Sequence, residues 1–241
     1  MGMRPPYSEY APPPLYIYPA RTGPRPGVHF SRTELFQLLV AILALSGALT
    51  VAQIFGLGSR RVGLADLGFA GLVFIASFVA VASGVGLHEI AHKIVAQRYG
   101  NWAEFRYDLR GLALAFLFAM FGFIIAAPGA TLISGVVSRE QNGRISAAGP
   151  ASNLLVGTGF LLAAETLLQT ASLTDFLSIF VTVLFVNAWL MNTILAGFNM
   201  IPILPFDGAK VWAWNKVAWI GIVVLVVSLY LAGVFLGLTG L

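Results

Sequence analysis

The sequence predicts an all-α polytopic membrane protein, and its composition and its long apolar runs carry that prediction. Of its 241 residues, 58% are hydrophobic and only 10% are charged, and the mean hydropathy is +0.85. A soluble domain carries roughly 25% charged residues, which excludes a water-soluble globular enzyme. Several uncharged runs reach the length of about 20 residues that a helix needs to cross a bilayer. We therefore expect five or six transmembrane helices embedded in the lipid bilayer.

The charge and cysteine content narrow the chemistry that is available to the chain. Fourteen Lys and Arg residues against ten Asp and Glu give a net charge of +4. In a membrane protein, an excess of basic residues reflects the orientation of the chain in the bilayer. The positive charge is therefore no sign of nucleic-acid binding, and no nucleic-acid partner is expected. Cysteine is absent, so a metal site must use His, Asp, Glu or backbone oxygen, and the three histidines are His29, His88 and His92.

The N-terminal segment differs in composition from the rest of the chain. Residues 1–28 hold eight of the twelve prolines, with four tyrosines between them. Such a stretch cannot build a core and predicts a disordered or polyproline-like tail. We expect a cytoplasmic tail at 1–32 and a membrane-embedded domain at 33–241. The tail is either an inert leader or a docking segment for a partner that binds proline-rich sequence.

The first two apolar runs predict the first two spans. Leu35–Phe55 and Leu67–Leu87 each contain 21 residues without a charge. The second run continues directly into a His-Glu-Ile-Ala-His sequence at 88–92, and its helical pattern persists to about Gln97. We expect this segment to be a single long helix.

A short insertion follows this helix. Residues Trp102–Asp108 and Thr131–Val137 each resemble a short strand. Between them, Gly111–Ala127 is 17 residues long, which is marginal for a span. Because Pro128 and Gly129 suit a bend, we expect a re-entrant or interfacial hairpin there.

Three further spans are expected in the C-terminal half. Asn142–Gly143 is a turn signal, after which a span runs over Ile145–Leu168. Phe176–Ile201 is uncharged over 26 residues and is ended by two prolines within the next four positions. The last apolar run covers Val211–Gly240.

The histidine motif points to metal chemistry. His88 and His92 are four residues apart, so on a helix they share one face and can bind one zinc ion. Glu89 lies beside the first of them, where it can accept a proton from an attacking water. Ionisable groups at the end of an apolar span are costly and usually functional. The alternative is a pair of interfacial histidines with a glutamate that reaches toward water.

A catalytic zinc site usually has three protein ligands, so a third must lie elsewhere. Asp207 follows a helix end broken by prolines, and irregular backbone at membrane depth is tolerated where it lines protein or water. This favours a cavity at Asp207, although a plain Asp-Gly turn at the surface is the alternative. The acidic candidates are Asp66, Glu104, Asp108, Glu140, Glu165, Asp175 and Asp207.

With these motifs in place, the sequence resembles the site-2 protease family of intramembrane zinc metalloproteases, peptidase family M50. Besides the motif at 88–92, the match includes the small-residue motif Gly149–Asn153 and the segment from Asn199 through Pro202 to Asp207-Gly208. The resemblance implies one zinc ion per chain and a catalytic core at about 64–215. It assigns His88, His92 and Asp207 as zinc ligands and Glu89 as the catalytic acid and base.

Three asparagines are candidates for contact with the substrate. The resemblance implies that Asn153 helps to hold the substrate chain or the oxyanion, whereas hydrogen bonding between helices is the alternative. Asn192 and Asn199 are seven residues apart on one face, and the same two interpretations apply to them.

The predicted activity is peptide-bond hydrolysis in or near a transmembrane segment of another protein. A helix hides its carbonyl groups, so the segment has to unwind locally, and it could then pair with the edge of a strand at 102–108 or 131–137. Two alternatives stay open, namely a membrane metal transporter and a catalytically inactive homologue that binds helices.

The distribution of basic residues predicts the topology. With five crossings, 12 of the 14 basic residues lie inside and only Arg60 and Arg61 lie outside. With six crossings, Asp207 would lie on the opposite face from the histidines, and one zinc ion cannot bridge about 30 Å of hydrocarbon. We therefore expect a multi-pass protein of the cell membrane with five crossings, a cytoplasm-facing zinc site and an external C-terminus.

Overall fold

A computed structural model describes residues 27–55, 67–122, 128–170 and 175–238. The expected disordered tail lies almost entirely outside these residues, as does the loop that carries Arg60 and Arg61.

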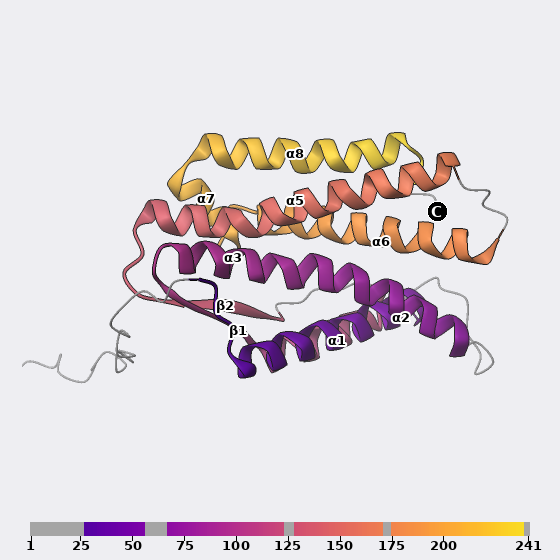
Figure 1. Cartoon of the computed structure of the whole chain (residues 1–241), viewed down its shortest axis with the longest axis horizontal. Helices are drawn as coiled ribbons and strands as arrows, with labels where there is room; N and C mark the ends of the chain where they lie inside the picture. The colour runs from indigo at the N-terminus through magenta and orange to yellow at the C-terminus, as the bar shows by residue number, and fades with distance from the viewer. Residues whose placement is uncertain (1–26, 56–66, 123–127, 171–174, 239–241) are drawn as a thin grey trace, which may run out of the picture.

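Five helical segments of the described chain are long and apolar enough to cross a membrane, which confirms the all-α polytopic class at the lower expected count. Figure 1 shows them side by side, with consecutive segments running in opposite directions. The second segment is continuous from α2 through one π-helical turn, η2, into α3. The spans are α1 (Arg32–Phe55), α2 (Leu67–Val81) with η2 (Ala82–Gly86) and α3 (Leu87–Arg98), α5 (Arg139–Thr170), α6 (Phe176–Asn199) and α8 (Lys216–Phe235).

Polar side chains mark where several spans begin. Ser31 and Glu34 form a capping box at the start of α1, in which the Glu34 N–H donates to Ser31 Oγ at 3.1 Å. Asp175 accepts from the Ser178 N–H at the start of α6, and Asn215 caps α8 in the same way. These caps satisfy backbone donors that have no partner inside the helix.

The insertion after α3 contains one short helix between two paired strands. It consists of β1 (Trp102–Tyr107), α4 (Leu109–Ala119) and β2 (Gly129–Ser134), and the strands pair antiparallel from Trp102↔Ser134 to Tyr107↔Gly129. The expected second strand therefore begins two residues earlier and ends three residues earlier than predicted.

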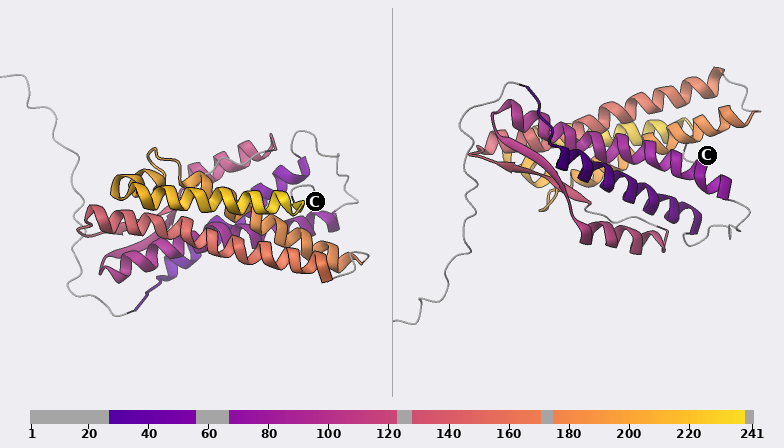
Figure 2. Two further views of the ribbon diagram at one scale, coloured as in Figure 1. Left: turned by 90° about the horizontal axis from the view of Figure 1, so that it is seen from above. Right: turned by 60° about the horizontal axis from the view of Figure 1, so that its bottom comes forward.

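The two ends of this insertion meet. The Asp108 N–H donates to the Pro128 carbonyl at 2.9 Å, so the chain leaves at the point where it enters. With 11 residues, α4 is about 16 Å long, roughly half the thickness of the hydrocarbon core. It packs along α1 through Leu112, Ala115 and Ala119. The right-hand view of Figure 2 shows the α4 ribbon beside that of α1. This geometry agrees with the re-entrant hairpin that the sequence predicts.

Side chains of α1 and α3 cover the outer edge of β1. Backbone groups that point away from β2 are paired one by one with these side chains. Lys93 also forms a fully buried ion pair with Glu34, at 2.6 Å, so the sheet is fastened to both helices. The pairs on this edge are Phe105 N–H to Glu34 Oε1 at 3.1 Å, Tyr107 N–H to Gln37 Oε1 at 3.2 Å, and Lys93 Nζ to the Ala103 carbonyl at 2.7 Å.

The region around residue 143 differs from the prediction. Asn142–Gly143 is no turn, because both residues lie inside α5. Gly143 is buried against Trp214 of helix α7 (Asp207–Trp214), and a Cβ atom there would lie 2.2 Å from the tryptophan Cβ. Close helix packing thus explains this glycine.

Candidate metal centre

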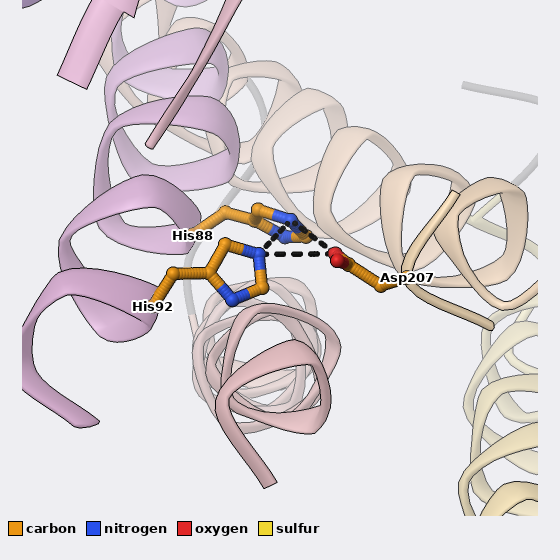
Figure 3. Close-up of side chains that lie close together, drawn as sticks. All are labelled: His88, His92 and Asp207. Atoms are coloured by element: carbon orange, nitrogen blue, oxygen red, sulfur yellow. Dashed lines mark hydrogen bonds and ion pairs between the residues drawn. The ribbon is translucent and has the colours of Figure 1, made fainter. Parts of the chain in front are cut away.

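Three residues from two separate helices converge on one point. His88 and His92 extend from α3, and Asp207 meets them from the first position of α7 (Figure 3). Asp207 Oδ2 lies 3.3 Å from His88 Nε2 and 3.0 Å from His92 Nε2. All three side chains are buried, and one nitrogen or oxygen atom from each lies within 4.8 Å of the others. This group could hold one metal ion.

The second nitrogen of each ring fixes the tautomer of the histidine. His92 Nδ1 lies 2.7 Å from the Ile145 carbonyl of α5, which can only accept, so Nδ1 carries the proton. His88 Nδ1 lies 2.6 Å from Asn153 Oδ1 and is likewise the donor. Both Nε2 atoms are therefore left with a free lone pair, as metal ligation requires.

The arrangement of donors fits a cation. The two Nε2 atoms are only 3.0 Å apart, and two lone pairs at that distance repel each other unless a cation or a proton lies between them. Gly149 of α5 leaves room beside them, because a Cβ atom at this position would lie 2.5 Å from both Nε2 atoms. The residues present thus suit a tightly enclosed metal ion.

A chain of amide hydrogen bonds holds Asn153 in place. Its Nδ2 donates to the Gly84 carbonyl and to Asn192 Oδ1, both at 2.9 Å, so its Oδ1 must face His88. Asn192 in turn donates to Ser83 Oγ at 3.1 Å. Gly84 and Ser83 belong to the π-helical turn, and such turns often occur at functional sites. The structure therefore places Asn153 behind His88, fully buried.

Asp207 is held at the junction between α6 and α7. Its Oδ1 lies 3.4 Å from Lys210 Nζ. Gly208 allows α7 to begin against the end of α6, because a Cβ atom there would lie 2.3 Å from the Met200 carbonyl oxygen.

A cavity of about 270 Å³ opens beside the cluster. Glu89 lines it, and its Oε2 accepts from the N–H of Thr131 at 2.9 Å and from the hydroxyl of the same residue at 2.8 Å. Residues Pro128 to Thr131 and Ile133 form the wall on the side of β2. Asn199 lines the cavity from α6, and its Nδ2 donates to the Leu195 carbonyl at 3.0 Å.

The other acidic candidates among the described residues have partners away from the cluster. Each of them pairs with a basic residue, caps a helix or contacts a neighbouring side chain. Glu104 pairs with Arg106, Glu140 with Arg144 and Glu165 with Gln169, whereas Asp108 caps α4 and Asp175 caps α6. Asp66 lies outside the described residues.

Some contacts at this site escaped the sequence analysis. The sequence predicts Thr131 only as the first residue of a strand, Lys210 only as a basic residue on the cytoplasmic side, and Ile145 only as the start of a span. Backbone carbonyl groups leave no signature in sequence. A threonine that contacts a glutamate 42 positions away is not marked by any local pattern.

The fold and the site together define a polytopic helical membrane protein with a buried cluster of two histidines and one carboxylate that could hold a metal ion. The chain is 38% identical over 192 residues to a protein of Methanocaldococcus jannaschii that is provisionally named a zinc metalloprotease. That match covers 79% of this chain and 88% of the relative, so the chain belongs to this family of zinc metalloproteases.

A second relative is more distant. It is named a zinc metalloprotease of the same organism and is 26% identical over 152 residues, which span 59% of this chain and 34% of that protein. No protein-family model matches the chain. No solved structure matches it either. Family membership and the donor set together identify zinc as the metal.

Proposed function

We propose that this protein is an intramembrane zinc endopeptidase of the site-2 protease type, which cuts membrane-protein substrates in or near their transmembrane segments. One observation carries the proposal. The metal cluster, Glu89 and an open strand edge all face a single cavity that lies within a bundle of helices able to span a membrane. A scissile peptide in this cavity would meet every group that hydrolysis needs.

The chain's own residues account for the steps of the reaction. His88, His92 and Asp207 would hold the zinc ion, which when bound acts as a Lewis acid that activates water and polarises the scissile carbonyl. Glu89 accepts the proton of the attacking water and passes it to the leaving nitrogen. The three side chains of the cluster are buried, and their low exposure to water strengthens these electrostatic interactions.

The strand edge offers a means of holding an unwound substrate. The outer edge of β1 is covered by α1 and α3, whereas β2 lines the cavity. An extended segment that adds to β2 would gain main-chain hydrogen bonds and present its carbonyl groups toward the metal cluster. Asn199, on the opposite wall, is placed to contact this segment, whereas Asn153 acts through His88.

Substitution of the general base tests the proposal. Purified protein and Glu89→Gln are compared on a panel of single-span substrates, with zinc content measured in parallel. We expect cleavage to fall by about 10²-fold or more in Glu89→Gln, because the base is lost, with zinc retained. Equal cleavage by both proteins would contradict the proposal. Zinc flux that is unaffected by the substitution would favour a transporter, and absence of cleavage by the unaltered protein would favour a homologue that only binds helices.

Substrate pairing with β2 has its own test. The Ile133 N–H faces away from β1, so Ile133→Pro removes one donor from the open edge and leaves the β1 ladder intact. Ile133→Ala shortens the side chain but keeps this N–H, and it is therefore the matched control. We expect the proline variant to cleave at least about tenfold more slowly than the alanine variant with zinc unchanged, because an edge hydrogen bond is lost. Equal rates for the two variants would argue against pairing.

A further inference from the structure

The contact between Glu89 and Thr131 joins the expected base to the open edge of β2. Glu89 Oε2 accepts two hydrogen bonds from this one residue, from the backbone N–H at 2.9 Å and from the hydroxyl at 2.8 Å. Thr131 Oγ1 also lies 3.2 Å from the Glu89 carbonyl oxygen. A hydroxyl has a single proton, and we assign it to the carboxylate, which is closer and is the better acceptor. In this conformation the carboxylate is fastened to the strand.

The register of the sheet shows that this N–H is one of those an added strand would use. Thr131 lies opposite Phe105, whose own N–H points outward to Glu34. Residues opposite each other in an antiparallel pair either exchange both hydrogen bonds or neither, so the N–H and C=O of Thr131 also point outward. They lie midway along the edge, between the equivalent groups of Gly129 and Ile133.

A strand that adds to β2 would therefore compete with Glu89 for the Thr131 N–H. One N–H cannot make a full hydrogen bond to both acceptors. If a substrate carbonyl takes the N–H, the carboxylate keeps the hydroxyl as its remaining partner. The Thr131 hydroxyl can turn about the side-chain bonds of the residue. It can therefore stay hydrogen-bonded to the carboxylate when the carboxylate moves toward the metal cluster, which lines the same cavity.

We propose that Thr131 is the positioning residue for Glu89, and that it couples the docking of an extended substrate to the release of the base. Its N–H holds the carboxylate at the strand edge until a substrate carbonyl replaces it, and its hydroxyl then orients the carboxylate for proton transfer. This inference rests on the proposed protease function for the second step alone, since the resting contact exists without substrate.

Amide hydrogen exchange on the zinc-loaded protein tests the resting contact without any substrate. Loss of a hydrogen bond to a charged acceptor should speed exchange at the Thr131 amide by about tenfold or more in Glu89→Ala. The Phe105 amide, opposite in the same sheet but bonded to Glu34, is the internal control and should be unchanged. Exchange at Thr131 that does not respond to Glu89→Ala would overturn the proposal.

Two substitutions at Thr131 test the second step. Thr131→Val removes the hydroxyl but keeps the N–H and the branched shape, whereas Thr131→Ser keeps both hydrogen-bonding groups. We expect Thr131→Val to lower kcat about tenfold or more with KM and zinc content unchanged, because only the orientation of the base is altered. Thr131→Ser should retain most of kcat, because it keeps the hydroxyl that orients the base.

The exchange experiment and the kinetic experiment distinguish failure of this inference from failure of the proposed protease function. An unchanged kcat in Thr131→Val, or an equal loss in Thr131→Ser, would refute the coupling. If the unaltered protein cleaves no substrate, the protease proposal fails, while the exchange comparison still decides whether Thr131 holds Glu89.

Discussion

Residues that lie outside the metal cluster determine which nitrogen of His88 and of His92 carries the proton. Asn153 Oδ1 faces His88 only because its amide nitrogen is committed to the Gly84 carbonyl and to Asn192. Partners of this kind fix the orientation of a ligand, and their removal typically lowers metal affinity by about 10- to 100-fold.

Asn153→Leu should therefore weaken zinc binding by about 10- to 100-fold, since the His88 ring loses the acceptor that fixes its tautomer. Asn192→Leu should weaken it less, because Asn192 touches Asn153 and not the histidine. Competition for zinc against a chelator of known affinity would measure both. Zinc affinity in Asn153→Leu equal to that of the unaltered protein would show that Asn153 only joins helices.

Much of the candidate site could be read at this scale from the sequence, and the reason is local geometry. The spacing of His88 and His92 dictates a shared helix face, and Asp207 was among the expected ligands. The structure brings all three together. The support from Ile145 and Thr131 could not be foreseen, because it depends on how distant elements pack.

At the scale of helices, α5 supplies the surface against which the two histidines lie. Gly149 and Gly159 both belong to this helix, but only Gly149 faces the cluster. A Cβ atom at Gly149 would lie 2.5 Å from both Nε2 atoms, whereas a Cβ atom at Gly159 would have no neighbour within 4 Å. Alanine at Gly149 and alanine at Gly159 change helix propensity alike, but only the first fills space beside the two histidines. Comparing the two variants therefore separates these effects.

Gly149→Ala should abolish stoichiometric zinc binding, because its methyl group overlaps both ligand atoms. Gly159→Ala should bind zinc normally and gain about 0.5–1 kcal/mol of stability at most, from the lower conformational entropy of alanine. Metal analysis of the purified variants measures the first effect, and thermal unfolding in detergent measures the second. A fully zinc-loaded Gly149→Ala protein would mean that α5 can move away from the histidines.

The helices themselves were the most predictable elements, because a span needs a long uncharged run and the chain contains several. The start of α5 was missed because Asn142–Gly143 carries a strong turn signal. Packing of Gly143 against Trp214 overrides that signal, and no local pattern records it. The break at Asn215 between α7 and α8 was missed because Asn215 and Lys216 interrupt the apolar run over only two positions.

For the whole molecule, the insertion decides which ends of the spans meet. Because the insertion returns to its starting point, α3 ends and α5 begins at the same end of the bundle, and α6 descends to that end as well (Figure 1). An additional crossing at 111–127 would place Asp207 at the opposite end from the histidines. The metal cluster therefore depends on α4 being too short to span.

The basic residues of the chain predict how this bundle is oriented in the membrane. Nine described basic residues lie at or near the end that carries the sheet and α7, from Arg32 and Lys93 to Lys210 and Lys216, and the positive-inside rule assigns this end to the cytoplasm. A cysteine at Val136, which is 97% exposed between β2 and α5, should resist an impermeant thiol reagent in intact cells and react once they are permeabilised. Gln169→Cys, in the last turn of α5, should react from outside in intact cells. The native chain contains no cysteine, so neither signal has a background. If Val136→Cys were labelled from outside and Gln169→Cys were protected, the orientation would be opposite to the predicted one, and the zinc site would lie on the outer face.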